Sequence, residues 1–353
     1  MKEFEKVYHL SHIDLDGYGC QYLTSKVFDK IKFYNANYGA EVQQKLEQIY
    51  KDIKKEKEQK EFTPLILITD LNLTTKECNV LEKEAMKLGA KILLLDHHGT
   101  GANAAERFAW YHLDTTKCAT LITYNWLREN FNFDEKKEYE PIVQAINAID
   151  IWVEESPYFP YGRVLLGMIS NAREVDRVAF AKEDNSYRLA LIEAAKQILD
   201  KYPLQEAPIA LDDKIHFIKK EFFKFDFNDT KDNLVASYIT NLLSKNKDEM
   251  TVNYKGKKGI LTCSTGNTSL IGNNFLKANP DYDFYLEVSS RGTLGLRSDN
   301  KMDVSKMAME IGNGGGHPNA SGGKIENYKD SFVYENFKEF IQEYLDKKAS
   351  ENE

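Results

Sequence analysis

The sequence predicts an α/β protein of two domains, an N-terminal domain with a parallel sheet covered by helices on both faces and a smaller C-terminal α/β domain. Three observations predict this. The chain has 353 residues, which is more than one compact core usually contains. Short apolar runs alternate with amphipathic stretches over the first 150 residues, as in strand–helix repeats. A shorter alternation near the C-terminus leads into a glycine-rich stretch, residues 312–323.

The N-terminal strands are expected at apolar runs of about five residues, a length typical of strands. Because these runs do not alternate with polar residues, they are typical of strands that are buried on both faces of a parallel sheet. Thr74 or Thr75 is a candidate N-cap of the third helix, and Gly89 is its candidate C-cap. The expected strands are 7–11, 31–35, 65–69, 91–95 and 108–112, and the helices are 18–28, 41–61 and 75–89.

The pattern turns helical over residues 136–243, with breaks at Pro203 and Pro208. A second α/β unit follows, with strands expected at 259–263, 283–288 and 293–297 and a terminal helix after the glycine-rich stretch. We therefore expect a first domain over 1–200, a helical connector over 201–245 and the C-terminal domain over 246–346.

Composition narrows the class of protein. Hydrophobic residues make up 42% and charged residues 29%, as in soluble globular proteins. The net charge of −8, from 47 basic and 55 acidic residues, argues against binding of long nucleic acid. The charged start of the chain (1–6) predicts no signal peptide, and no apolar run is long enough to cross a membrane. Four scattered cysteines without a CxxC pair are typical of a reduced, cytoplasmic protein without structural zinc.

The first candidate site is the segment that contains His12, Asp14 and Asp16. In an extended segment, alternate residues share a face, so these three side chains would point the same way. Two carboxylates that are so close repel each other unless a cation or a proton lies between them. The alternative is a surface turn in which the aspartates cap a helix.

Three more acidic positions follow apolar elements. Asp70 follows the strand at 65–69, and Asp96-His97-His98 follows the strand at 91–95, where open α/β sheets bind ligands. Asp150 lies inside an otherwise apolar stretch and should be paired or bound to a metal. The alternatives are a turn or cap residue for Asp70, a polar turn for the Asp-His-His run, and an ordinary salt bridge for Asp150.

Together these positions predict a site for two divalent cations. Carboxylates mixed with imidazoles suit Mn²⁺ best, with Mg²⁺ as the alternative. Two such ions about 3.5–4 Å apart can activate a water and stabilise charge in an attack on phosphorus. The metal-ligating candidates are His12, Asp14, Asp16, Asp70, His97 and Asp150.

The order of these motifs resembles that of the DHH phosphoesterase superfamily. A fifth match is the run from Gly312 to Gly323, which is similar to the GGGH signature of the associated C-terminal substrate-binding domain. The resemblance covers nearly the whole chain, and it implies a metal-dependent phosphoesterase that hydrolyses phosphodiester bonds.

The resemblance also implies a role for each residue. Asp70 would bridge the two metals, Asp96 would orient a neighbouring histidine, and His98 would lie beside the scissile phosphate as a charge stabiliser or proton donor. One metal would be held by His12 and Asp14, and the other by Asp16, His97 and Asp150. The first motif is shorter than in many members of the family, so His9 stays open as an alternative to His12.

The glycine-rich stretch has a physical reason to bind phosphate, because glycines let backbone N–H groups approach an anion closely. His317 lies inside this stretch. Arg297 lies at the end of an expected strand and could hold a phosphate through two hydrogen bonds. The substrate-binding candidates are Arg297, Gly314, Gly315, Gly316, His317 and Ser321, with Asn319 as a further polar contact.

Within the superfamily, the two-domain layout is most similar to nanoRNases, and the form of the first motif resembles the oligoribonuclease (nanoRNase) B type. The resemblance implies stepwise exonucleolytic hydrolysis of short oligoribonucleotides to mononucleotides, with 3′,5′-bisphosphorylated adenosine as a further substrate. Two alternatives stay open: a phosphodiesterase for cyclic or linear dinucleotides such as c-di-AMP, and a non-catalytic nucleotide-binding regulator. The expected partner is short RNA or a dinucleotide, with no long nucleic acid and no membrane. The protein could be a monomer or a homodimer.

Overall fold

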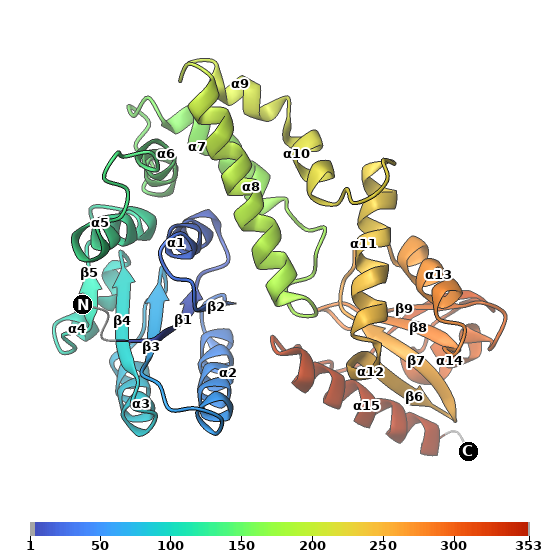
Figure 1. Cartoon of the computed structure of the whole chain (residues 1–353). Helices are drawn as coiled ribbons and strands as arrows, with labels where there is room; N and C mark the ends of the chain where they lie inside the picture. Colours follow the sequence, from blue (N-terminus) through green and yellow to red (C-terminus); the bar gives the residue numbers. More distant parts are fainter. Residues whose placement is uncertain (1–3, 352–353) are drawn as a thin grey trace. The chain divides into compact units, whose positions relative to one another are not determined.

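The computed structural model describes residues 4–351, which form two compact units (Figure 1). The charged start of the chain, from which we expect no signal peptide, falls partly outside these residues. The first unit contains Met1–Ala172 and Asn185–Ile218, and the second contains Arg173–Asp184 and Lys219–Glu353.

The first unit is built on a sheet of five strands in the order β2-β1-β3-β4-β5, and every neighbouring pair is parallel. This confirms the predicted parallel sheet. The last strand starts later than the expected 108–112, because the amide of Phe108 bonds to Ala104 and closes a helical turn. The strands are β1 Lys6–Ser11, β2 Ile31–Asn35, β3 Pro64–Thr69, β4 Lys91–Asp96 and β5 Tyr111–Leu113.

Helices cover both faces of this sheet, as Figure 1 shows. Crossovers between parallel strands are right-handed. The connection from β1 to β2 therefore places its helix on one face, and the connections from β2 to β3 and from β3 to β4 place theirs on the other. On the second face Ile49, Leu81 and Ile66 belong to one buried cluster. The helices are α1 Leu15–Ser25 and α5 Ala119–Phe131 on one face, and α2 Ala40–Lys57 and α3 Thr75–Lys87 on the other.

The chain order creates a topological switch point at the carboxyl ends of β1 and β3. From β1 the chain proceeds to β2 on one side, and it then returns to β3 on the other side. Adjacent connections diverge at such a switch point, which is where open α/β sheets bind their ligands. His12 follows β1, Asp70 follows β3, and Asp96 ends β4, so the fold positions three of the candidate motifs at one edge.

The other helices extend the first unit beyond its sheet. Helix α6 packs against α5 and α7, and it places Asp150 at its last position. No helix in the described part of the chain has the length and apolar character needed to cross a bilayer. These elements are η1 Gly99–Gly101, α4 Ala102–Ala105, α6 Glu140–Asp150, α7 Phe159–Ser170, α8 Ala181–Lys201, α9 Ala207–Asp212 and α10 Ile215–Phe222.

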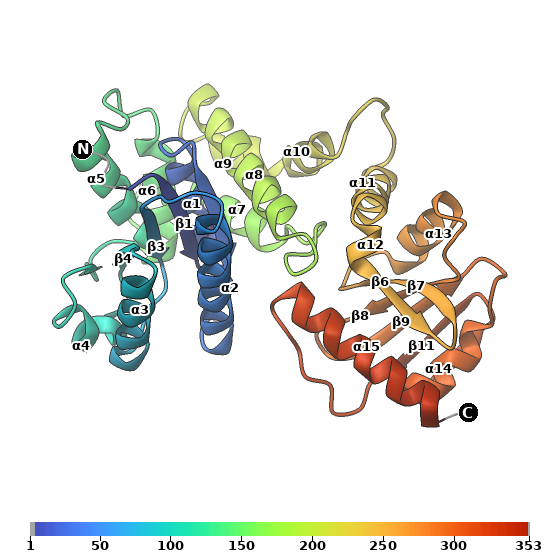
Figure 2. The ribbon, with the colours of Figure 1, turned by 60° about the horizontal axis from the view of Figure 1, so that its bottom comes forward.

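The second unit is a six-stranded sheet in the order β10-β11-β9-β8-β7-β6, in which only β7 and β8 are parallel. Helices α14 and α15 share one buried cluster with the sheet, and α13 packs against β8 and β9 (Figure 2). The elements are α11 Lys231–Lys245, α12 Lys247–Met250, β6 Thr251–Tyr254, β7 Lys257–Thr262, α13 Thr268–Ala278, β8 Phe284–Val288, β9 Thr293–Ser298, α14 Val304–Gly312, β10 Gly315–His317, β11 Ala320–Lys324 and α15 Tyr334–Glu351.

The division between the units differs from the expected boundaries at 200 and 245. Residues 173–184 belong to the second unit although they come before the first unit ends. Glu174 accepts bonds from Lys219 at 3.3 Å and from Lys231 at 3.1 Å, and this pairing ties the segment to the second unit. Such a long-range ionic contact leaves no periodic signal in the sequence.

Two glycines of α7 make the packing of α6 testable. A methyl at Gly162 would lie 2.3 Å from the Ala145 carbonyl of α6, whereas one at Gly167 meets nothing within 4 Å. We predict that Gly162→Ala lowers the free energy of unfolding by about 1–3 kcal/mol through overpacking. Gly167→Ala on the same helix should raise it by up to about 1 kcal/mol, because alanine favours helix. Urea denaturation of both variants checks this, and equal effects would contradict the close approach of α6 and α7.

Candidate metal centre

The acidic motifs converge from separate elements of the first unit. His12 and Asp14 lie between β1 and α1, and Asp70 directly follows β3. His97 follows β4, and Asp150 ends α6. The sheet edge therefore brings together side chains that lie as far as 138 residues apart in the sequence.

Asp14 and Asp16 are placed differently from the extended segment that the alternating pattern predicted. Helix α1 starts at Leu15, so Asp14 is its N-cap and Asp16 lies in its first turn. Asp14 Oδ1 accepts the amide of Gly17 at 3.0 Å. Asp16 accepts the amides of Ala119 and Thr120 at 2.7 and 2.8 Å, at the first turn of α5. Both carboxylates are thus anchored by helix N-termini, which favour negative charge.

The first cluster contains His12, Asp14 and Asp70. His12 Nδ1 lies 2.7 Å from Asp14 Oδ2 and 3.6 Å from Asp70 Oδ2. Burial lowers the pKa of His12, but its hydrogen bond to Asp14 and the nearby carboxylate of Asp70 outweigh this and raise the pKa to about 10. Burial raises the pKa of Asp14, but His12 holds it at about 2. Without a cation, the positive charge of His12 balances these carboxylates.

The second cluster contains Asp16, His97 and Asp150. Three carboxylate oxygens surround His97 Nε2, at distances longer than a typical N–H···O hydrogen bond. They belong to Asp70 at 3.3 Å, Asp150 at 3.6 Å and Asp16 at 3.8 Å. Burial, followed by the charge of Asp16, raises the pKa of Asp150 to about 8. The single N–H group at Nε2 cannot donate a good hydrogen bond to all three of these oxygens.

Asp70 lies between the two clusters. Its Oδ1 faces His97 and its Oδ2 faces His12. Its side chain is 2% exposed, and Oδ2 has no hydrogen-bond partner among residues 4–351. Its backbone has a φ of 56°, in the left-handed region. Burial, followed by the charges of Asp16 and Asp14, raises the pKa of Asp70 well above its usual range.

These features fit divalent cations. A buried carboxylate oxygen without a partner is costly unless a cation or a proton compensates it. In each cluster the three ligand atoms lie within 4.8 Å of one another, and no cysteine takes part. The imidazole and carboxylate donors suit Mn²⁺. Asp70 offers one oxygen to each cluster, as a bridging ligand does. The six metal-ligating candidates thus fall into these two neighbouring clusters, and a third group of possible ligands, Asp70, His97 and His98, overlaps them.

Asp96 orients His98 rather than His97. Its Oδ1 lies 2.7 Å from His98 Nδ1, and its Oδ2 accepts the Tyr111 hydroxyl at 2.8 Å. Asp96 is fully buried, so this carboxylate holds one ring nitrogen of His98 as a donor. One ring nitrogen of His98 also lies within 4.8 Å of a ligand atom of Asp70 and of His97. Because Asp96 engages Nδ1, the second nitrogen, Nε2, is the one that could act on a ligand.

Tyr38 is a site residue that the sequence analysis missed. Its hydroxyl lies 2.8 Å from His98 Nε2, and its ring lies 4.7 Å from that of His12. Burial, followed by the charges of Asp70 and Asp14, raises the pKa of Tyr38, so the phenol stays protonated and donates. In the sequence, Tyr38 differs from the other tyrosines only in its position shortly after the strand expected at 31–35.

His9 does not join the clusters. Both of its ring nitrogens bond to threonine hydroxyls, of Thr24 at 2.9 Å and of Thr69 at 2.8 Å. Burial lowers its pKa to about 3, so it stays neutral. The geometry therefore favours His12 over His9 as the histidine of the first motif.

The substrate-binding candidates lie in the second unit. Arg297 bonds to the Ser269 hydroxyl at 2.7 Å and to the carbonyl of Leu296, with no carboxylate partner recorded in the described chain. It lies opposite Ala320, which in turn lies opposite His317, so the three share a row across β9, β11 and β10. His317 is exposed. Arg297 and His317 thus lie in one register on the edge side of this sheet.

Most of the glycine-rich stretch forms a β-hairpin of β10 and β11. Methyl groups at Gly314 and Gly316 would lie 1.9 and 2.6 Å from carbonyl oxygens of β11, so the hairpin itself requires these glycines. A methyl at Gly315 meets nothing within 4 Å. The Ser321 hydroxyl donates to the His317 carbonyl, and Asn319 bonds to Asn300, so both side chains brace the hairpin.

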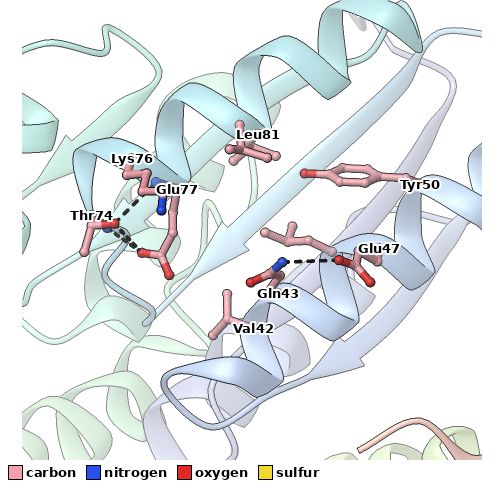
Figure 3. A pocket seen from close by; sticks show the side chains of 10 residues that line it. Val42, Gln43, Glu47, Tyr50, Thr74, Lys76, Glu77 and Leu81 are labelled. Carbon is pink, nitrogen blue, oxygen red and sulfur yellow. Dashed lines mark hydrogen bonds between the residues drawn. The ribbon is translucent and has the colours of Figure 1, made fainter. Parts of the chain in front are cut away.

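A separate groove of about 340 Å³ lies between α2 and α3 (Figure 3). Its polar residues bond within their own helices, Gln43 to Glu47 and Thr74 to Glu77. The groove contains none of the metal or substrate candidates. The chemistry of the first unit is therefore at its acidic clusters rather than at this groove.

Comparisons with known proteins find relatives over nearly the whole length of this chain. Residues 275–350 match the model of the DHHA1 domain. A 3′,5′-cyclic-nucleotide phosphodiesterase of Helicobacter pylori (strain ATCC 700392 / 26695) is 41% identical over 347 residues, which cover 96% of this chain and 98% of the relative. The crystal structure of an uncharacterized protein from Helicobacter pylori G27 has a TM-score of 0.89 and 40% identity, over 97% of this chain and 99% of that one.

The raised pKa values predict how pH affects the metal-free protein. The folded chain holds protons on Asp150 up to a pKa of about 8 and on His12 up to about 10, whereas the unfolded chain releases them earlier. Stability must therefore fall as pH rises from 7 to 9. We predict that the increase in Tm on adding Mn²⁺, relative to chelator, grows over this range, because the cation replaces those protons. Calorimetry at several pH values checks this, and an increase that shrinks with pH would contradict it.

Replacing Asp70 tests the bridging position. Asn has the same shape and tolerates a left-handed backbone, so Asp70→Asn removes the charge while it keeps the fold. We predict an unchanged or higher Tm in chelator, a smaller rise in Tm with Mn²⁺, and a loss of phosphodiesterase activity of at least about 100-fold. Asp212→Asn, at an exposed carboxylate at the end of α9, is the control. An Asp70→Asn protein with normal metal response would exclude the bridging role.

Proposed function

The chain belongs to the DHH phosphoesterase superfamily and is a hydrolase of phosphodiester bonds, and on this premise we propose that it hydrolyses 3′,5′-cyclic nucleotides with two divalent cations. The observation that carries the metal proposal is Asp70, a buried carboxylate without a hydrogen-bond partner for Oδ2 in the described chain, between two clusters of ligand atoms. The superfamily membership rests on the DHHA1 match over residues 275–350 together with the phosphodiesterase that is 41% identical over 96% of this chain.

Two sets of residues would hold the cations, which we propose to be Mn²⁺. His12 and Asp14 would hold one cation, Asp16, His97 and Asp150 would hold the other, and Asp70 would contact both. When bound, two such ions activate a water and neutralise the charge of the phosphate. The helix N-termini that anchor Asp14 and Asp16 fix their oxygens before any cation arrives, so little reorganisation is needed.

His98 acts on the leaving oxygen. Asp96 keeps its Nδ1 protonated, so Nε2 is the atom that exchanges a proton with the substrate. The water adds to phosphorus as the bond from phosphorus to a ribose oxygen breaks, and the proton that the water loses would pass through Nε2 of His98 to that oxygen. Tyr38 donates to the same Nε2 and positions the ring until substrate replaces its hydroxyl.

The proposed substrate is small because the chain is acidic. A net charge of −8 repels a polyanion, whereas one phosphate at a cationic centre is tolerated. A cyclic nucleotide carries a single phosphodiester. The Helicobacter pylori relative of nearly equal length carries the name 3′,5′-cyclic-nucleotide phosphodiesterase. These two observations favour cyclic nucleotides as the first substrate class.

Short oligoribonucleotides are the second candidate, and the second unit favours them. Arg297 has no carboxylate partner recorded among the described residues, and β10 presents an exposed glycine-rich edge beside His317. Such a surface suits a second phosphate or a chain end. Because both substrate classes contain a 3′,5′-phosphodiester, the same metal centre could hydrolyse either of them.

A substrate panel tests the proposal. The purified protein is assayed with Mn²⁺, Mg²⁺ or chelator against 3′,5′-cyclic AMP and GMP, ribonucleotides of two to five residues, c-di-AMP and 3′,5′-bisphosphorylated adenosine. We expect Mn²⁺-dependent hydrolysis of the cyclic nucleotides, with a kcat/KM at least about tenfold above that of the others, a difference of about 1.4 kcal/mol in transition-state binding. Higher kcat/KM with short RNA or c-di-AMP would transfer the assignment to that class. No turnover under any condition would overturn the enzymatic assignment.

Two substitutions in the second unit separate the substrate candidates. Arg297→Ala should raise KM at least about tenfold for short RNA, because a charge-assisted contact is lost, and should raise KM less for a cyclic nucleotide. Gly315→Ala, which the hairpin tolerates sterically, should raise KM if a ligand lies against this backbone. Gly167→Ala, equally open but in the first unit, is the control for the added methyl.

A further inference from the structure

Trp152 occupies a backbone position that strongly disfavours it. Helix α6 ends at Asp150, Ile151 is its C-cap, and the amide of Val153 bonds to the carbonyl of Ala148 at 2.8 Å. This is the bond of a Schellman motif, and Trp152 is the residue in its left-handed position, with a φ of 58°. Glycine is the usual residue there, because a Cβ in that conformation crowds the backbone.

Packing does not explain the tryptophan. Its side chain is 62% exposed, so most of its apolar surface lies in water. One contact is an edge-to-face arrangement with Phe159 at 5.2 Å, and another is the indole N–H bond to Glu154 at 2.8 Å. These contacts orient the ring but bury little of it. A strained, exposed aromatic side chain next to a functional group indicates a role in ligand binding.

The position relative to the acidic cluster defines what the ring could bind. Trp152 lies two residues after Asp150, so their Cα atoms are at most about 7 Å apart. Glu154 and Glu155 are exposed beside it, so a phosphate would be repelled from this surface. A neutral aromatic group would not be repelled. In a nucleotide only one sugar separates the base from its phosphate, so a base at Trp152 is compatible with a phosphate near Asp150.

We propose that Trp152 is the stacking platform for the nucleobase of the substrate. This inference rests on the proposed function, because it places the phosphate of that nucleotide at the acidic cluster. Stacking on an indole face accepts any base, since every base has a π-face. Trp152 would therefore favour the binding of nucleotides over phosphodiesters without a base, and it would distinguish little between adenine and guanine.

Trp152→Gly provides an unusually clean test, because it places the favoured residue at the left-handed position. We expect an unchanged or higher Tm, a KM for 3′,5′-cyclic AMP raised at least about tenfold, and an unchanged KM for ribose 3′,5′-cyclic phosphate, which has no base. Trp152→Phe should be intermediate. Asn132→Gly, at the left-handed end of α5, is the matched backbone control and should leave both KM values unchanged.

A binding measurement keeps the inference separate from the proposed activity. Adenosine 5′-monophosphate, added with Mg²⁺, should quench the tryptophan fluorescence of the wild-type protein, and the quench should be lost in Trp152→Phe although Trp110 and Trp126 remain. If Trp152→Gly hydrolyses cyclic AMP with an unaltered KM, base stacking on Trp152 is excluded, whereas the proposed phosphodiesterase activity is supported. A lower Tm with both substrates equally affected would show a structural residue instead. Quenching without turnover of any nucleotide would support the platform and reject the activity.

Discussion

Electrostatic repulsion among buried carboxylates is the constraint on which the first unit depends. Asp14, Asp16 and Asp70 lie within a few ångströms of His12 and His97 in a largely buried setting. Like charges in such a place cannot all stay ionised without a counter-charge. The raised pKa values of Asp70 and His12 are the response of the chain alone: it holds protons where cations would otherwise neutralise the cluster.

The fold opposes this repulsion with backbone dipoles. The N-terminus of α1 donates to Asp14, and that of α5 donates to Asp16. The right-handed crossover from β1 to β2 places α1 on its face of the sheet, and α5 packs against α1. The same parallel order brings the carboxyl ends of β1, β3 and β4 to one edge. The carboxylates repel one another, but the strands and helices that carry them are stabilised by apolar burial away from the site. The apolar cluster beneath α2 and α3 is an example.

The sequence predicted the parallel sheet and the grouping of Asp70 with His97, because both residues follow apolar strands and the carboxyl ends of parallel strands meet. It misplaced Asp16, because the extended alternation ignored the capacity of Asp14 to start a helix at Leu15. Tyr38 could not be predicted, since its place beside His98 depends on a turn at Gly39 with a φ of 82°. The pairing of Glu174 with Lys219 is equally non-local.

Substrate choice must come from groups other than the ligand atoms, because every phosphodiester offers the same anionic oxygens to a pair of cations. Beside the cluster, the exposed side chains that could contact the rest of a substrate include Tyr38 and Trp152, and both are uncharged. A cyclic nucleotide has one phosphate for the cations and an otherwise neutral body for such surfaces. Each further phosphate of an oligonucleotide needs its own positive partner, and the side chains of Tyr38 and Trp152 carry no positive charge. Arg297 in the second unit is the candidate for that partner. We therefore propose that substrate length depends on how many positively charged partners lie outside the metal ligands.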